Sequence, residues 1–579
     1  MLLQFSRFIH DENPSFTCHY GKFDIGTLLS KGLDYVEERW VHDSHLLAFT
    51  SPIKIPEMYL EDYAERRREL NKTRTHKYRE AGAHSLKTLA PYFLNVQPFW
   101  EPDTGYDNDE YVTLDARYAL QLTNYFLNLF EREYGKALEF YQERYLPWTK
   151  NLLQMELDGI TIDQPALLTM WDKTIRELKV TEDELKDTWY EAFSAYQELE
   201  YKRITAKYDA MRSTKNTEKA LAMVERNRVK ALDKVEPLNL SSPTQLAWLL
   251  RDYFGLNITS SEGDSESTGA ETLERLANKN AGVKLLLKHR GLNKLSTSFF
   301  PEYQSRLEGT KIHTTLNSAT ARTGRLSSSN PNLQQVPGEL HDLFIASPGH
   351  LLVTKDLSAI EPTILAYFSE DDNLCKLMIS KGDFHGTNAQ RMFDLDCDPL
   401  EVKVKYKGHR DIAKLVGLAV LYGAGWRRVF FEMTKAGFTD VTEWQCKEFV
   451  KRLREFYSGV WEFKKQLDSE LERGSVLYNL LGRPFKIQAS TDVYMKGLNT
   501  LIQGSASDLL QDATYQLRQA GFKPLLLVHD EVIIEVPDDN TIKENERTIE
   551  AFLTKRPLPT KHGNIPIRVE GKVSKRWQK

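Results

Sequence analysis

Residues 524–537 have the sequence PLLLVHDEVIIEVP, in which two apolar runs flank the polar triplet His529-Asp530-Glu531. Two apolar runs joined by a short polar turn predict a β-hairpin. Polar side chains between two strongly apolar strands are costly unless the tip of the hairpin uses them. We therefore expect this turn to carry chemistry, although Asp530 taken alone could be an ordinary turn residue.

A second strand-like run, Leu351–Lys355, ends in Asp356 and continues into the helix-starting segment Leu357–Pro362. If the hairpin packs beside this strand, Asp356 and Asp530 meet. Two close carboxylates repel each other, and one takes up a proton unless cations neutralise the pair. Oxygen ligands suit Mg²⁺, and two Mg²⁺ ions on a carboxylate pair are suited to in-line attack at a phosphoryl group. Taken alone, Asp356 could equally be a helix cap.

The helix predicted over residues 410–423 brings four side chains onto one face, because positions four apart are neighbours on a helix. A face that runs cation, cation, aliphatic, aromatic fits a triphosphate, a sugar and a base laid along it. Arg offers a forked phosphate clamp and Lys a mobile proton donor. A partly exposed amphipathic helix is the simpler alternative for the same pattern. The four residues are Arg410, Lys414, Leu418 and Tyr422.

These three segments, in this order, resemble motifs A, B and C of the family A DNA polymerases. Each motif alone is weakly specific, but with four further matching segments they form an ordered series over about residues 150–575. The further matches are Asn239–Leu246, Thr323–Ser328 with Pro331–Pro337, Asp383–His385 and Asn499–Asp508.

The resemblance implies an α/β right-hand polymerase fold, with an α+β palm and helical thumb and fingers, preceded by a partial ribonuclease H-like exonuclease domain. It places a truncated exonuclease-like domain at residues 1–140 and the polymerase domain at 141–579. Within the polymerase domain, the expected thumb covers about 165–300, the palm about 301–375 and 490–579, and the fingers about 376–489.

The resemblance also implies roles for the residues near the palm carboxylates. Asp356 and Asp530 are expected to hold two Mg²⁺ ions, for which Mn²⁺ is an alternative, with Leu357 beside them in the metal site and Glu531 as a further catalytic carboxylate. The primer 3′-hydroxyl would attack the α-phosphate while the metals stabilise the developing charge. Glu361 would crowd the 2′ position of the sugar and so favour deoxynucleotides.

On the predicted helix, Arg410 and Lys414 are expected to hold the incoming triphosphate together with His385, and Lys414 is the candidate general acid for the pyrophosphate. Tyr422 and Gly423 would lie near the templating base. Leu418 stands where the family usually has an aromatic residue, so the sequence leaves its effect on nucleotide selection open.

Four residues are expected to contact DNA by the same resemblance. Minor-groove acceptors common to all correct base pairs can be probed without reading the sequence, and this role is implied for three of them, while the fourth would touch the primer terminus. They are Arg325, Asn499 and Gln503 for the groove, and His529 for the terminus.

The N-terminal segment resembles part of a 3′–5′ exonuclease. His19–Asp24 is similar to the second exonuclease motif and Tyr111–Asp115 to the third, which makes Asp24, Tyr111 and Asp115 the remnant of that site. The D-x-E strand of the first motif is not found upstream of the second. With two of four carboxylates absent, two-metal hydrolysis is expected to fail, so the domain would be a structural base or be completed by a separate exonuclease subunit.

Charge is distributed unevenly along the 579 residues. The chain has a formal charge of −5 and a pI near 6.3, which taken alone argues against a nucleic-acid binder that works by bulk positive charge. Residues 202–234, however, hold ten Lys and Arg against four acids. Phosphate contacts depend on the local field rather than on the sum, so this stretch is either a solvated helical face or a contact with a phosphate backbone.

The composition also indicates the cellular compartment in which the protein is expected to act. The four cysteines are scattered without a CxxC pair, which favours a reducing compartment, and no apolar run is long enough for a membrane span. We expect a cytoplasmic protein of a bacterial or phage-infected cell that does not act at a membrane. The expected partners are primer–template DNA and dNTPs, with a processivity factor left open.

Two alternative functions share parts of this pattern. A non-catalytic primer–template binding factor would have no need of the intact residues Asp356, Asp530, Arg410 and Lys414. A single-subunit RNA polymerase is disfavoured by Glu361 and by the exonuclease-like segment.

Overall fold

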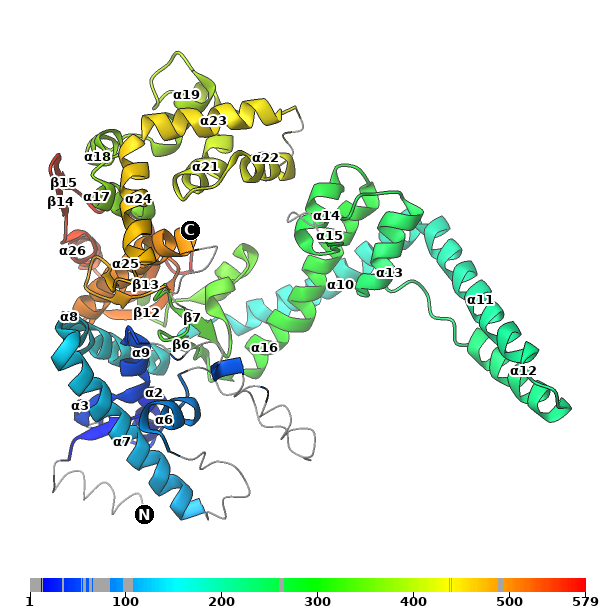
Figure 1. The fold of residues 1–579 in the computed structure, drawn as a ribbon, viewed down its shortest axis with the longest axis horizontal. Helices are drawn as coiled ribbons and strands as arrows, with labels where there is room; N and C mark the ends of the chain where they lie inside the picture. The colour runs from blue at the N-terminus through cyan, green and yellow to red at the C-terminus, as the bar shows by residue number, and fades with distance from the viewer. Residues whose placement is uncertain are drawn as a thin grey trace.

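The computed structural model arranges the chain as a β-sheet core with helical lobes around it (Figure 1). The region upstream of the second exonuclease-like motif, where the first motif would lie, falls mostly outside the described residues. The structure describes residues 12, 14–33, 36–53, 55, 59–61, 65, 84–96, 108–259, 265–321, 323–436, 438, 440–487 and 493–578.

The central sheet has four antiparallel strands in the order β12-β13-β9-β16. The apolar runs of residues 524–537 form the hairpin β12 (Lys523–Val528) and β13 (Glu531–Pro537), as predicted. Strand β9 (His350–Leu357) pairs with β13 on one side and with β16 (Val569–Ser574) on the other. The turn of the hairpin therefore lies beside the end of β9.

Two helices pack against this sheet: α25 (Val493–Gln519) contacts β12 and β13, and α26 (Ile542–Thr554) contacts β9, β13 and β16. Lys355 on β9 is buried, and its Nζ donates to Glu546 (2.7 Å) and Glu550 (2.6 Å) of α26. Because neighbouring residues on a strand point to opposite faces, Asp356 points away from α26, and it is exposed. The Asp356 carboxylate therefore lies on the face of the sheet opposite α26 and is accessible to solvent.

Small strands extend the core below this sheet. Helix α9 (Leu146–Asp158) ends at Gly159, whose φ of 58° allows the turn into β3. Strand β3 joins a second four-stranded sheet, and β6 pairs with β7. The strands are β3 (Ile160–Ile162), β4 (Leu307–Glu308), β5 (Lys311–Ile312), β6 (Thr315–Asn317), β7 (Ser327–Ser329) and β8 (Phe344–Ile345).

The N-terminal elements share one hydrophobic core with the central part of the chain. The side chain of Lys22 is only 7% exposed and forms an ion pair with Glu156 of α9, and the main-chain N–H of Asp43 donates to the hydroxyl of Tyr141 (2.8 Å). The N-terminal elements therefore pack directly against the central part of the chain. The elements are β1 (Phe16–Cys18), α2 (Gly21–Leu29), α3 (Val36–Arg39), β2 (Trp40–Asp43), α4 (Ser44–Thr50), α6 (Leu86–Leu94), α7 (Asn108–Glu133) and α8 (Gly135–Phe140).

A helical arm with its own hydrophobic core occupies residues 164–305. Leu185, Leu249 and Leu286 are fully buried in this second core, and α11 and α12 form a long hairpin that projects away from the body (Figure 1). The helices are α10 (Gln164–Thr188), α11 (Tyr190–Ser213), α12 (Glu218–Leu232), α13 (Pro243–Ala247), α14 (Ala270–Ala277), α15 (Ala281–Lys294) and α16 (Phe300–Ser305).

A second helical lobe follows β9 and faces the arm across the sheet end (Figure 1). No helix in the described part of the chain is long and apolar enough to cross a bilayer. The helices of the lobe are α17 (Ile360–Ser369), α18 (Asp372–Ile379), α19 (Phe384–Phe393), α20 (Val402–Lys405), α21 (Lys407–Leu421), α22 (Trp426–Lys435), α23 (Glu443–Phe456) and α24 (Ser458–Glu472). The hairpin of β10 (Leu477–Tyr478) and β11 (Pro484–Phe485) follows them, with the Tyr478 ring 5.5 Å from Nζ of Lys136 on α8. The hairpin of β14 (Leu558–Thr560) and β15 (Gly563–Ile565) contacts α17 and α18.

Candidate active site

The two predicted carboxylates meet at the open end of the central sheet. The main-chain N–H of Leu357, next to Asp356, donates to the carbonyl oxygen of Asp530 (2.9 Å). His529 adopts the left-handed conformation (φ 55°) that closes the turn between β12 and β13. Strand pairing thus joins two segments that are far apart in the sequence, as the hairpin hypothesis predicted.

The Asp530 carboxyl carries the electrostatic signature of a crowded acidic site. The pKa of Asp530 is raised to about 6, chiefly by burial; the charge of Arg325 lowers it, and the neighbouring carboxylates of Glu361 and Asp356 add to the rise. A carboxyl group in such surroundings is stabilised either by a proton or by a cation.

We expect Asp530→Asn to stabilise the metal-free protein at pH 8 by roughly 1–2 kcal/mol, since it removes a carboxylate charge that is penalised by burial and by the neighbouring carboxylates. The folded-state pKa of about 6 exceeds the ordinary 3.8, so the penalty is complete above pH 6 and disappears as the pH falls below 4. Urea denaturation in EDTA at both pH values would measure the gain. Asp538→Asn, at the exposed far end of β13, is the matched control, and destabilisation at pH 8 by Asp530→Asn would contradict the prediction.

Glu361 links three parts of the site. Its Oε1 accepts a hydrogen bond from Nη2 of Arg325 (2.7 Å), and its Oε2 accepts one from the Tyr422 hydroxyl (2.8 Å). Burial, followed by the nearby Glu361 carboxylate, raises the pKa of Tyr422 well above its ordinary value, so the hydroxyl remains a donor. The start of α17 and the end of α21 are therefore held together over the carboxylate pair.

Glu531 and Leu357 make contacts that the sequence did not predict. Glu531 lies opposite Asp356 in the strand register, but it is 2% exposed and its Oε1 accepts a hydrogen bond from the indole N–H of the buried Trp577 (2.6 Å). The Leu357 side chain is buried and aliphatic, so only its main-chain atoms could contact a metal.

The cations predicted on α21 lie beside α19. Arg410 donates from Nε and Nη2 to the two carboxylate oxygens of Asp383 (2.7 and 2.9 Å). Burial would raise the pKa of Asp383, but the hydrogen bonds from Arg410 hold it below the ordinary value. Burial and the positive charge of Arg410 lower the pKa of His385. Lys414 is exposed one turn further along the helix.

The three residues expected at the minor groove lie on adjoining elements. Asn499 and Gln503 are half-buried one turn apart on α25. The loop that carries Arg325 packs on the same helix, where the Ser507 hydroxyl donates to the carbonyl of Gly324 (3.0 Å). In this structure Arg325 is engaged by Glu361, so its guanidinium already faces the carboxylate site.

Sequence reasoning missed three contributors to the site. Asp383 belongs to a matching segment, but nothing in that segment predicts that it orients Arg410. Glu570 was overlooked, although it is exposed on β16 and lies directly opposite Asp356 in the register. Asp508 had no predicted role, and it is buried against Arg483 (2.7 Å) behind the Arg325 loop. Strand pairing and burial identify these residues, whereas local sequence gives no signal for them.

The exonuclease-like residues do not converge on a comparable cluster. Burial is the main cause that raises the pKa values of Asp24 and Asp115. The charged neighbour that also affects the pKa is Asp43 for Asp24 and Lys87 for Asp115. Asp43 accepts hydrogen bonds from the main-chain N–H groups of Tyr20 and Gly21 and caps α4. Tyr111 lies under the Lys87 ammonium, 5.3 Å from its ring centre. Among the described residues, no group of three or more metal-ligating side chains is present.

The sequence model of DNA polymerase family A matches residues 208–579, well over half of the chain. The chain belongs to DNA polymerase family A. Palm is here the name for the central sheet with α25 and α26, thumb for the arm of residues 164–305, and fingers for the helices from α18 to α24; the predicted subdomain bounds themselves stay a prediction.

Comparison with individual family A proteins supports this membership. The chain is 28% identical to the thermostable DNA polymerase I of Thermus filiformis over 491 residues, which are 80% of this chain and 51% of that protein. It is 28% identical to Bacillus subtilis DNA polymerase I over 59% of this chain and 40% of that protein. The chain thus spans about half or less of the curated relatives it matches.

A solved structure shares the fold across nearly the whole chain. The POL domain of Pol1 from M. smegmatis, determined in complex with DNA primer-template and dNTP, superimposes with a TM-score of 0.73. The match covers 99% of this chain and 88% of that one at 21% sequence identity. The predicted right-hand polymerase fold is therefore confirmed.

Proposed function

We propose that this protein is a template-directed DNA polymerase that adds deoxynucleotides to a primer 3′-hydroxyl. The observation that carries the proposal is the meeting of Asp356 and Asp530 at the open end of the palm sheet, beneath the helix that carries Arg410 and Lys414. Family membership supports the same reaction.

The carboxylate pair fits divalent metal ions. The raised pKa of Asp530 beside Asp356 and Glu361 marks a crowded acidic site, at which two carboxylates and water would supply the oxygen ligands that Mg²⁺ prefers. Asp356 and Asp530 would hold the ions, and Mn²⁺ could replace Mg²⁺. When bound, the ions supply Lewis-acid stabilisation of charge on the phosphoryl group.

Residues of the fingers would bind the incoming triphosphate and donate the proton to the leaving group. Asp383 fixes the orientation of Arg410 through two hydrogen bonds, so the remaining N–H groups of the guanidinium can meet a triphosphate without loss of side-chain order. Lys414, exposed and one turn away, can give a proton to the departing pyrophosphate. His385, with its lowered pKa, is a neutral donor beside them.

Primer extension tests the proposed function. With a primed template and Mg²⁺, the protein should extend the primer with dNTPs and much less with rNTPs. A non-catalytic binding factor would bind the same DNA without extension, and an RNA polymerase would prefer rNTPs. Either of those outcomes would overturn the proposal.

We expect Glu361→Ala to raise the incorporation of ribonucleotides relative to deoxynucleotides by about tenfold or more, since one lost steric and hydrogen-bonding contact accounts for about 1–3 kcal/mol of discrimination. Tyr422→Phe removes only the hydroxyl that donates to Glu361 and is the matched control. The measurement is the ratio of kcat/KM for the two sugars. An unchanged ratio in Glu361→Ala would exclude Glu361 as the group that faces the 2′ position.

We also expect the purified chain to leave a mismatched primer 3′ end intact in Mg²⁺ without dNTPs. Asp43 accepts main-chain hydrogen bonds, and Asp24 and Asp115 have different electrostatic neighbours, so the described residues do not assemble the ligands of a two-metal hydrolytic site. The 3′-labelled primer should keep its length over the time of a complete extension reaction. Steady shortening would contradict the prediction, and a separate exonuclease subunit is the partner that this arrangement would require.

A further inference from the structure

A buried indole ring contacts the acidic end of the palm sheet. Trp577 follows β16 and is fully buried, and its indole N–H donates a hydrogen bond to Oε1 of Glu531 at 2.6 Å. Glu531 is also buried, and it is the residue directly after Asp530. The hydrogen bond therefore joins an enclosed aromatic side chain to an acid beside the proposed metal site.

The Trp577 ring is held by its neighbours and by its own main chain. His341 stacks on it with ring centres 3.9 Å apart and 13° between the planes, and Phe344 contacts it edge-on at 5.6 Å. The main-chain N–H of Trp577 donates to the carbonyl of Phe344 (2.9 Å), and that of Ala346 donates to the carbonyl of Lys575 (3.0 Å). These contacts fix the direction in which the indole N–H points.

The position of Glu531 in the sheet explains why this direction matters. Glu531 lies directly opposite Asp356 in the pairing of β13 with β9. Residues opposite each other in an antiparallel pair lie on the same face, with Cβ atoms about 4.5–5.5 Å apart. A glutamate side chain that starts at this distance can reach ions held by Asp356 and Asp530, so the indole N–H determines where its carboxylate lies.

Packing alone does not account for an acid at position 531. A buried carboxylate costs more free energy than a buried amide, because its charge loses the solvation of water. A glutamine of the same length could accept the hydrogen bond from Trp577 without that cost. The charge of Glu531 therefore has a use besides packing, and divalent ions at the neighbouring aspartates would provide one.

We propose that Trp577 is a positioning residue of the polymerase reaction. Its indole N–H fixes the carboxylate of Glu531 beside Asp356 and Asp530, and it keeps this hold when metal ions are bound. A carboxylate that is already in place does not have to reorganise when ions and substrates arrive. The inference rests on the proposed polymerase function, because it assigns Glu531 a fixed place in that active site.

The first test compares two buried tryptophans by single-nucleotide addition. Trp577→Phe keeps an aromatic ring but removes the N–H, and it should lower kcat by about tenfold, the effect of one hydrogen bond to a charged group. The KM for dNTP and the affinity for DNA should not change. Trp148→Phe is the matched control and should leave kcat unchanged, because Trp148 is equally buried and its indole N–H has no acceptor among the described residues.

A double-mutant cycle with Glu531→Gln distinguishes positioning from general damage to the palm. Because Trp577 acts through the Glu531 carboxylate, Trp577→Phe should lower kcat no further once residue 531 is Gln. Losses in kcat that multiply in the double variant would overturn the proposal. An unchanged kcat in Trp577→Phe alone would overturn it as well.

Nuclear magnetic resonance of the intact, DNA-free chain with isotope-labelled tryptophan tests the contact without catalysis. The indole proton of Trp577 should resonate downfield as a donor to a carboxylate, should move in Glu531→Gln, and should remain downfield when Mg²⁺ is added to saturation. An upfield move on addition of Mg²⁺ would show that Glu531 leaves Trp577 for the ions, and would overturn the proposal. Wild-type protein that fails to extend a primer would refute the proposed function, whereas this spectrum would still decide the hydrogen bond.

Discussion

Replacement of Asp356 by Asn is expected to reduce kcat for single-nucleotide addition by about a thousandfold or more, with little change in the affinity for primer–template DNA. The amide retains the size of the side chain but removes one of the two charges that would hold the metal ions. Stabilisation of phosphoryl charge by metal amounts to several kcal/mol, and each 1.36 kcal/mol corresponds to a factor of ten in rate. The position is exposed on the open side of the sheet, so folding should be unaffected.

The measurement is rapid-quench extension by one dNTP, combined with DNA binding by anisotropy. Asp538→Asn is the matched control, because it removes a carboxylate at the other end of strand β13, where Asp538 is exposed. Extension by Asp356→Asn at a rate within tenfold of wild type would remove Asp356 from the metal site. Glu570, which lies opposite Asp356, would then be the next acid to replace.

Replacement of Asp508 by Ala is expected to lower the free energy of unfolding by about 3–5 kcal/mol, the largest stability effect we predict. The Asp508 side chain is fully buried and Arg483 is 6% exposed. Asp508 accepts hydrogen bonds from Arg483 (2.7 Å) and Asn479 (2.6 Å), and the guanidinium lies 4.6 Å from the ring centre of Tyr145. Removal of the carboxylate alone would leave a buried cation without its counter-ion.

The double replacement Arg483→Met/Asp508→Leu distinguishes a lost ion pair from general damage to the core. It removes both charges, so it should cost much less than Asp508→Ala despite changing two residues. Glu401→Ala, which breaks the exposed pair of Glu401 with Lys405, should cost at most about 1 kcal/mol. Urea denaturation, monitored by far-UV circular dichroism, would compare the free energies of unfolding of these three variants. A double variant less stable than Asp508→Ala would contradict the electrostatic explanation.

The location of this pair connects stability with the site. Gly324 has a φ of 75°, and a Cβ at that position would lie 2.9 Å from Nε of Arg483. The loop that presents Arg325 to Glu361 therefore rests directly on the buried pair. Sequence alone showed Asp508 only as the last residue of a matching segment, because a buried partner distant in the sequence leaves no local pattern.

The sequence by itself determined the family, the strand that ends in Asp356, the hairpin around Asp530 and the helix face with Arg410 and Lys414. These features depend on local patterns: apolar runs of strand length, a polar turn, and a spacing of four residues on a helix. Ordered motifs then identified the family without knowledge of any contact.

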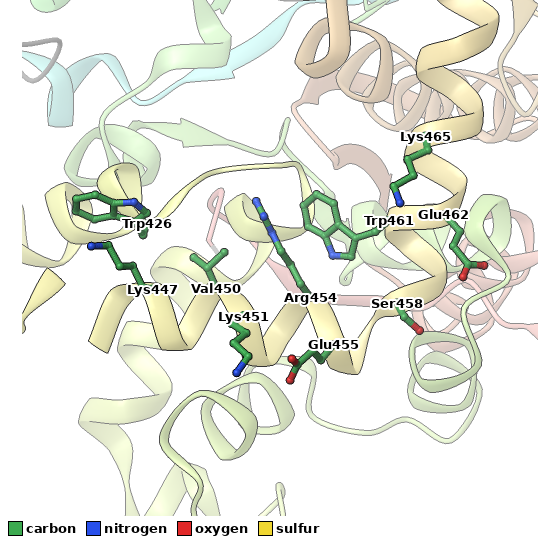
Figure 2. A pocket seen from close by; sticks show the side chains of 10 residues that line it. All are labelled: Trp426, Lys447, Val450, Lys451, Arg454, Glu455, Ser458, Trp461, Glu462 and Lys465. Atoms are coloured by element: carbon green, nitrogen blue, oxygen red, sulfur yellow. The ribbon is translucent and has the colours of Figure 1, made fainter. Parts of the chain in front are cut away.

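Only the tertiary structure decided which groups touch. It paired Arg410 with Asp383, linked Glu361 to both Arg325 and Tyr422, turned Glu531 toward Trp577 and brought Glu570 opposite Asp356. It also brought Trp426, Arg454 and Lys465, from α22, α23 and α24, to the lining of one hollow (Figure 2). Such contacts join residues from separate elements, and their energy depends on burial and distance, which local spacing in a sequence does not specify.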